Sequence, residues 1–387
     1  MGPRALVALV VLGGALGAWS ACSSDAAREE EPAVDASTVD VASPAVDAAS
    51  PVDGGEDVTD ASPASADCPD AGASLGAPKD LRCTGLYAPG PSSTIASDVR
   101  EYAPAHPLWS DSAEKTRWVR LPPGQKIDTS DMDEWTFPVG TKFWKQFVLG
   151  GKKIETRFLW KVDASTWLKT TYKWDAAEST ATRFDSGEWP GASGGDAGAY
   201  EIPSAAKCSQ CHGGRKDQVL GFEAVNLGLP GATGITLASL VSDGLLTNPP
   251  PATSLTIPED TTGVAGPALG WLHSNCGITC HSKSPGASCG FKGMVLRLAY
   301  DELHPSDGGA ASVKSLKAYT TTYEVTASLA PAPDKRIAHG NPSGSAISYL
   351  IGRRDPTNAN GQMPTLASHQ VDTAHVDAVN AWISALP

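Results

Sequence analysis

Two thiols and an imidazole fall within five consecutive residues, where the chain reads Cys-Ser-Gln-Cys-His from Cys208 to His212. On a helix, spacings of three and four residues bring Cys208, Cys211 and His212 to one face. This C-x-x-C-H pattern is typical of covalent haem c attachment, in which both thiols bond the porphyrin and the imidazole ligates its iron. A chain that carries it is expected to fold around that cofactor.

Zinc and a redox dithiol are two other interpretations of the motif. A zinc site would need further ligands, and the adjacent Cys211 and His212 would rarely both reach one tetrahedral ion. A redox dithiol would be expected in a thioredoxin-like βαβ setting, which the sequence does not suggest.

A second, expanded motif, C-x-x-x-C-H, contains Cys276, Cys280 and His281. Residues four apart on a helix still share a face, so we expect a second haem c here, with His281 on its iron. The alternative is that the site has lost its haem and that Cys276, Cys280 and Cys289 supply a disulfide instead.

A methionine in a loop is the expected partner of the second haem. Met363 precedes Pro364, which prevents helix continuation, and follows the second motif in the order of a single cytochrome c domain. We predict its thioether as an iron ligand opposite His281, a pairing that raises the reduction potential relative to two histidines. The alternative is a methionine that fills the core.

The opposite face of the first haem has no evident ligand, and an open iron there would favour chemistry over electron transfer. Among the histidines, His273 is the best placed to reach toward a neighbouring haem. The other histidines and internal methionines are Met132, Met294, His106, His304, His339, His369 and His375.

The chain begins with one positive charge and a short apolar run, from Ala5 to Trp19. That run is too short to span a bilayer, and with small residues before Cys22 it is typical of a lipoprotein signal peptide over residues 1–22. We expect lipidation of Cys22; simple cleavage or an uncleaved anchor are the alternatives. The prediction is a cell-envelope protein, anchored to a membrane by lipid and facing the periplasm or the cell exterior.

Residues 23–78 are rich in Ala, Asp, Ser, Pro and Val and cannot bury enough apolar surface to offset ordering entropy. We expect a disordered acidic tether, which holds thirteen Asp and Glu against one Arg and so carries most of the net charge of −13. The remainder is close to neutral, which argues against a nucleic-acid surface. In an oxidising compartment, Cys68 and Cys83 are expected to form a disulfide.

The next part of the chain is predicted to be a β domain over residues 79–190, antiparallel and sandwich-like. Eight of the eleven tryptophans lie between Trp109 and Trp189, which favours aromatic core packing over a platform for a sugar or another flat ligand. The strand-like segments are residues 115–121, 141–149, 152–162 and 167–174.

Residues 191–265 are expected to be a linker, glycine-rich at 190–200, that carries the first attachment motif. Residues 266–387 are expected to form an α-helical, cytochrome c-like domain with amphipathic helices around Ile347 and after Asp372. The predicted fold class is therefore a multidomain α+β chain.

The combined motifs resemble those of a group of secreted bacterial dihaem c-type cytochromes. The resemblance spans residues 81–387 and implies a β-rich N-terminal domain before a cytochrome c-like domain. It assigns Cys208, Cys211 and His212 to one haem, and Cys276, Cys280, His281 and Met363 to the other. The inserted residue in the second motif departs from the pattern. The segments that carry the resemblance are Pro107–Asp111, Leu121–Gly124, Phe137–Gly140, Cys208–His212, Trp271–Cys276 and Met363–Pro364.

These features predict an electron-transfer lipoprotein that exchanges electrons with redox partner proteins at the cell envelope. One alternative is a haem enzyme, peroxidase-like or substrate-oxidising, whose β domain binds the substrate. Another is a lipoprotein that binds glycan or peptide and uses haem only to stabilise its fold.

Overall fold

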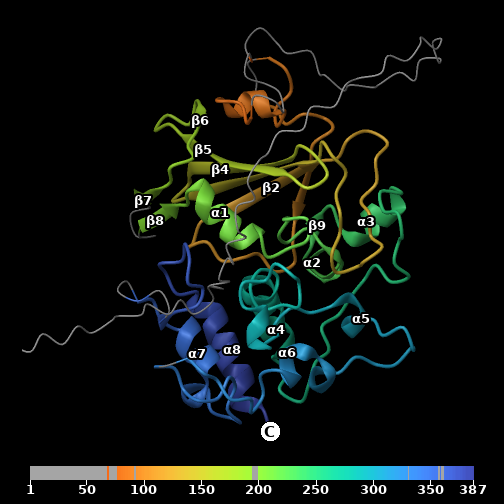
Figure 1. Cartoon of the computed structure of the whole chain (residues 1–387), viewed down its shortest axis with the longest axis vertical. Helices are drawn as coiled ribbons and strands as arrows, with labels where there is room; N and C mark the ends of the chain where they lie inside the picture. The colour runs from red at the N-terminus through yellow and green to blue at the C-terminus, as the bar shows by residue number, and fades with distance from the viewer. Residues whose placement is uncertain are drawn as a thin grey trace, which may run out of the picture.

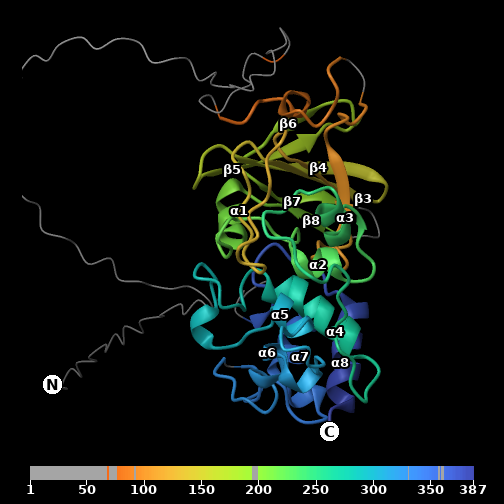
Figure 2. The ribbon, with the colours of Figure 1, turned by 90° about the vertical axis from the view of Figure 1, so that its right-hand side faces the viewer.

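The computed structural model describes residues 68, 76–90, 93–193, 199–329, 331–355, 358 and 361–387. Cys22 and the predicted signal peptide lie outside these residues, as does most of the predicted tether. The described chain has an α+β fold with a large antiparallel sheet at one end and short helices at the other, as Figures 1 and 2 show.

Seven strands form one antiparallel sheet in the order β6-β5-β4-β3-β2-β1-β9. The strands predicted from sequence alternation are confirmed as β2, β3, β4 and β5. In place of a two-sheet sandwich, the other sheet among the described residues is a two-stranded ribbon of β7 and β8, where a glycine-rich linker was expected. The strands are β1 (Arg100–Ala103), β2 (Glu114–Arg120), β3 (Lys142–Leu149), β4 (Lys152–Lys161), β5 (Trp167–Trp174), β6 (Ala181–Arg183), β7 (Glu188–Ser193), β8 (Ala199–Ile202) and β9 (Thr233–Gly234).

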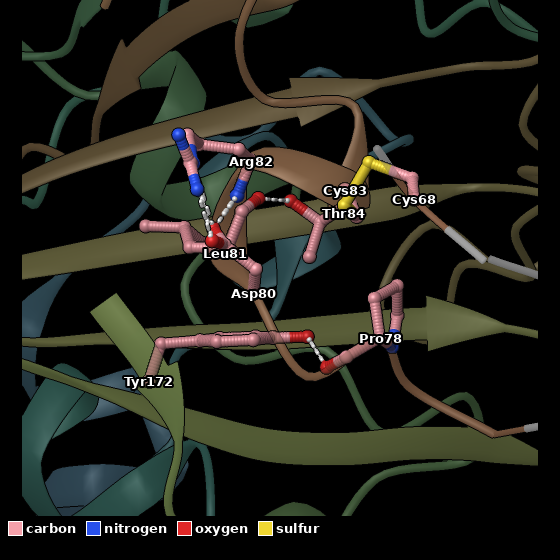
Figure 3. Close-up of a disulfide and its surroundings, with 8 residues drawn as sticks. All are labelled: Cys68, Pro78, Asp80, Leu81, Arg82, Cys83, Thr84 and Tyr172. Carbon is pink, nitrogen blue, oxygen red and sulfur yellow. Dashed lines mark hydrogen bonds and ion pairs between the residues drawn. A yellow bond between two sulfur atoms is a disulfide. The ribbon is translucent and has the colours of Figure 1, made fainter. Parts of the chain in front are cut away.

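The first residues of the folded part cover one face of the sheet. Trp144 and Tyr172 pack there with Leu81, and the Tyr172 hydroxyl donates a hydrogen bond of 2.8 Å to the carbonyl of Pro78 (Figure 3). Ala77 is only 3% exposed, so the folded part begins before residue 79 and the end of the predicted tether is corrected to an earlier position.

A disulfide joins Cys68 to Cys83 with their Cα atoms 5.5 Å apart, as Figure 3 shows. The predicted pairing is therefore confirmed. It attaches the chain just before the folded part to the 3-10 turn Leu81–Thr84, which lies on this covered face of the sheet.

The helices are short except for the last one. In α8, Val376, Val379 and Ile383 are buried at the predicted three- and four-residue spacing, and the helix packs against α4. The helices are α1 (Ala205–His212), α2 (Ala224–Gly228), α3 (Leu237–Ser242), α4 (Ala265–Leu272), α5 (Tyr300–Leu303), α6 (Lys317–Thr320), α7 (Ala346–Ile351) and α8 (Thr373–Ala385).

One hydrophobic core continues from the sheet into the helices. It contains Phe143 and Trp167 from the sheet as well as Leu269 and Trp382 from α4 and α8. The strand β9, from the segment predicted as a linker, completes the sheet beside β1. Helix α1 lies at the junction of sheet and helices (Figure 1).

Candidate cofactor-binding cavity

A cavity of about 720 Å³ lies where the sheet meets the helices. Its volume is in the range of sites that bind small molecules and cofactors, roughly 300–1,000 Å³. Both predicted attachment motifs line this one cavity, although they are far apart in sequence. The predicted site residues in its wall are Cys208, Cys211, His212, Cys276, Cys280, His281 and Met363.

The first motif occupies the second half of α1. Ser204 is the N-cap, and its side chain accepts a hydrogen bond from the backbone N–H of Lys207, which starts the helix four residues before the first thiol. Cys208, Cys211 and His212 then follow within a regular helix, as predicted.

The imidazole of His212 has the tautomer and the neutral charge state of histidines that ligate metals. Its Nδ1 lies 2.6 Å from the carbonyl oxygen of Gln218, and because a carbonyl only accepts, Nδ1 carries the proton and Nε2 keeps its lone pair. Burial lowers the pKa of His212 to about 4, so the ring is neutral at neutral pH. A neutral ring held by a backbone carbonyl is the form in which histidine ligates metals in proteins.

The segment after the first motif is anchored in the sheet. Asp217 accepts hydrogen bonds of 2.7 and 2.8 Å from the ammonium of Lys161 and one of 2.8 Å from the indole of Trp167. The Lys161–Asp217 pair is buried. Since Gln218 follows Asp217 directly, this anchor also fixes the carbonyl that orients His212.

The second motif begins in a π-helical turn rather than in a regular α-helix. The helix α4 runs into the turn His273–Gly277, where Ile278 donates to the carbonyl of His273 at 2.9 Å. The N–H of His281 likewise donates to the carbonyl of Cys276, five residues earlier, at 2.9 Å. A π turn holds one residue more than an α turn, so it absorbs the inserted residue and keeps Cys276 and His281 one turn apart.

The carbonyl of Cys276 also accepts from the N–H of Cys280, four residues later, at 3.3 Å, and both thiols line the cavity. Sequence spacing alone does not distinguish an α turn from a π turn. The two differ in whether a backbone N–H donates to the carbonyl four or five residues earlier. Both thiols are free, so the alternative in which they belong to a disulfide is not the arrangement found.

The two motifs meet backbone to backbone. A Cβ atom on Gly214 would lie 2.2 Å from the carbonyl oxygen of Thr279, and one on Gly286 would lie 2.1 Å from that of Gly213. Only glycine permits such an approach. The residues directly after the first motif therefore touch the second motif.

The four free thiols are protonated at neutral pH; Cys276 is buried, and Cys208, Cys211 and Cys280 are half-buried. Burial raises the pKa of Cys211 to about 11, and the neighbouring thiol of Cys280 adds to the effect. Burial likewise raises the pKa of Cys276 to about 12. Reactive redox dithiols instead have lowered pKa values. The strands of both sheets also pair antiparallel, unlike the βαβ setting expected for a thioredoxin-like site.

Two thioethers line the cavity. The loop of Met363 is fixed to α7 by a hydrogen bond of 2.9 Å from its backbone N–H to the carbonyl of Leu350. The second thioether is Met294, which lies two residues before Leu296, whose N–H donates to the carbonyl of His281 at 2.8 Å. Its position in the wall could not be read from the sequence, where no motif surrounds it.

Among the described lining residues the only imidazoles are those of His212 and His281. His273, the favoured sixth ligand in the sequence, is buried with both nitrogens engaged. Its Nε2 lies 3.3 Å from the carboxylate of Glu223, and its Nδ1 accepts from the N–H of Leu298 at 2.9 Å. His273 was one candidate among several histidines, and in the structure this side chain supports the fold.

A loop after β1 ties the sheet to the second motif. The backbone N–H of Trp109 donates to the side chain of Asn275 at 2.6 Å, and its indole donates to the carbonyl of Gln370 at 2.9 Å. Asp111 accepts from the N–H of His369 at 2.9 Å. Trp109 is the tryptophan that lines the cavity, whereas Trp118, Trp135, Trp144 and Trp167 are buried in cores, which confirms core packing for these four.

Glu134 connects both motifs from the side of the sheet. Its carboxylate lies 2.6 Å from the guanidinium of Arg297 and 3.3 Å from that of Arg215, and it also accepts from the hydroxyl of Ser284. Arg215 follows the first motif closely, and Ser284 follows the second. No sequence pattern marks this residue, because its partners Arg215 and Arg297 lie 81 and 163 positions away along the chain.

Comparisons with protein-family models, curated proteins and solved structures find no match to this chain. No group of three or more His, Cys, Asp or Glu side chains within the described ranges is arranged to hold a metal ion. In the same part of the chain, no helix is long and apolar enough to cross a membrane.

Proposed function

We propose that this protein is a c-type cytochrome that carries two covalently attached haems in one cavity and transfers electrons. The observation that supports this most strongly is the convergence of both Cys–Cys–His motifs on the same cavity wall. Haem iron, when bound, supplies a one-electron couple whose potential depends on the axial ligands and on burial.

The residues present fit two such groups. Cys208 and Cys211 would hold one haem and Cys276 and Cys280 the other, with His212 and His281 as iron ligands. Each thiol would add across a vinyl double bond, with its sulfur bonding one carbon and its proton going to the other, so the attachment would need no oxidant. The protonated state of the four thiols and the neutral state of His212 support this assignment.

The thioethers of Met294 and Met363 favour electron transfer over catalysis. Two histidines and two methionines in one wall would be enough to hold two irons from the protein side. Irons held in this way would exchange electrons without binding a substrate. The enzyme and the glycan-binding alternatives have no comparable observation in their favour.

Export and anchoring belong to the same proposal. The sequence of residues 1–22 supports secretion and lipidation at Cys22, and the acidic segment after it would let the folded part reach redox partner proteins from the membrane. The Cys68–Cys83 disulfide suits an oxidising compartment such as the cell envelope.

Haem counting in motif variants tests the proposal. The full-length chain is produced in a host that attaches haem c, and haem per chain is measured as the pyridine haemochrome. C208A/C211A and C276A/C280A are each expected to lose one of the two haems. The control C68A/C83A removes two cysteines outside the cavity and is expected to keep both; equal haem content in all three variants would contradict the assignment.

A further inference from the structure

A row of cations crosses the sheet beside the cavity. The register sets Arg117 of β2 opposite Lys145 of β3, and Lys145 opposite Arg157 of β4. Directly opposed residues of antiparallel strands have Cβ atoms about 4.5–5.5 Å apart, and like charges there repel each other. The row therefore destabilises the sheet unless a negative charge offsets it.

Among the residues that the structure describes, only one member of the row has a carboxylate partner. Arg157 is paired with the buried Glu155 at 2.6 Å and donates to the Tyr200 hydroxyl at 3.1 Å. Arg117 is 5% exposed, and its Nη2 is buried without a hydrogen-bond partner.

Lys145 lines the cavity and, among the described residues, has no carboxylate partner. Within the described part of the chain its ammonium makes no hydrogen bond or ion pair, and its nearest aromatic contact is the ring of Phe147, 5.4 Å away. Lys145 is half-buried and is one of the residues that line the cavity. Burial lowers the pKa of Lys145 well below its ordinary value. Arg117, Lys115 and Arg157 lower this pKa further, and the carboxylate of Glu155 opposes them.

No carboxylate of the wall is left to match Lys145. Among the described lining residues Glu201 is the one acid, and it is engaged by Lys207 and by His369. The wall carries six basic side chains against it, namely Lys145, Arg157, Lys169, Lys207, Lys292 and Arg336.

We propose that Lys145, flanked by Arg117 and Arg157, forms a carboxylate-binding subsite in the sheet-side wall of the cavity. The inference rests on the proposed function, because haem c carries two propionate carboxylates that would lie in this cavity. A small free carboxylate is the other source of the same chemistry. A carboxylate here offsets the desolvation cost of a buried cation, which is large when the cation is unpaired.

The test uses the full-length holoprotein with Lys145→Met, which keeps the length of the side chain and removes its charge. Lys152→Met is the matched control, since Lys152 is exposed at the start of β4 and belongs to the same sheet. Haem content is measured first, and a wild-type chain without haem contradicts the proposed function. The midpoint potential is then measured as a function of pH.

If the carboxylate is a propionate, K145M keeps its haem and its midpoint potential moves to a more negative value, because a cation that favours electron uptake is gone. The propionate also protonates at higher pH, so the potential of K145M varies more steeply with pH than that of wild type. K152M is expected to behave as wild type, since its charge is screened by solvent.

If the carboxylate is free, acetate or succinate added to oxidised wild type changes the haem spectrum, and K145M abolishes the change. Lys145→Arg keeps the charge and is expected to behave as wild type. If K145M loses its haem, the same measurements are made on K145R instead. The inference is overturned if K145M, with full haem content, matches wild type in potential, pH dependence and response to carboxylate. It is equally overturned if K145R departs from wild type as far as K145M does.

Discussion

The backbone N–H of His281 donates a hydrogen bond of 2.9 Å to the carbonyl of Cys276, five residues earlier in the chain. This π-type bond lets an attachment motif with one additional residue present its thiols and imidazole within one turn. It supports the view that the expanded motif is functional and not a degenerate copy of the first.

Gly277 tests the importance of this turn. A Cβ atom there would lie 2.4 Å from the backbone nitrogen of Arg297, so Gly277→Ala must displace the turn. We expect a loss of about 1–3 kcal/mol in the free energy of unfolding, as for other overpacked sites. The second haem should be lost selectively, as measured by haem per chain.

The matched control for Gly277 lies in the preceding helix. A Cβ on Gly266 in α4 would meet the carboxylate of Glu259 at an ordinary 3.5 Å, and alanine favours a helix over glycine by about 1 kcal/mol. Gly266→Ala should therefore keep both haems. Equal haem content in G277A and G266A would show that the turn tolerates displacement.

Glu134 is predicted to hold both attachment segments in place. Glu134→Gln would leave Arg215 and Arg297, which are 6% and 7% exposed, without their carboxylate. Removing one partner of a buried ion pair costs about 3–5 kcal/mol, so denaturant unfolding should show a loss of that order. Glu101→Gln, at an exposed position of β1, should change stability little; an equal loss in both variants would contradict the role of Glu134.

The carboxylate of Glu134 should also make the stability of the protein depend on pH. Burial alone would raise the pKa of Glu134, but Arg215 and Arg297 outweigh burial and lower it below the ordinary value of 4.5. A lowered pKa in the folded state gives stability that is present above pH 4.5 and is lost as the pH falls through the folded-state pKa. Between neutral pH and pH 3, wild type should lose more stability than E134Q, and parallel pH curves would refute this.

The two cavity methionines are predicted to ligate iron. Met363→Ala and Met294→Ala should each remove part of the Met-to-iron charge-transfer absorption of the oxidised protein at the red end of the spectrum. Met132→Ala is the control, because Met132 packs against the main core and does not belong to the cavity wall. An absorption band unchanged in M363A or in M294A would refute that residue as a ligand.

Local features of this fold were predictable because local sequence determines them. The strand-like segments 141–149, 152–162 and 167–174 predicted strands that the structure contains as β3, β4 and β5. The buried spacing of α8 was equally visible. The disulfide of Cys68 and Cys83 followed from their position at the start of the folded part.

Long-range features could not be predicted in the same way. The meeting of the two motifs depends on close backbone contacts such as that of Gly214 with Thr279, which have no signature in a single sequence. Likewise, the cation row became visible only when the strand register placed Arg117, Lys145 and Arg157 side by side. The sequence also left several candidate histidines open, and only tertiary packing shows that both nitrogens of His273 are engaged.

The mass of the intact, denatured full-length chain tests the central claim most directly. Haem bound only by coordination leaves an unfolded chain, whereas thioether bonds retain it. We predict that the denatured chain carries the mass of two haems, and that peptides containing Cys208 with Cys211 and Cys276 with Cys280 each retain one. A denatured chain with no added haem mass, after production in a host that attaches haem c, would contradict the account.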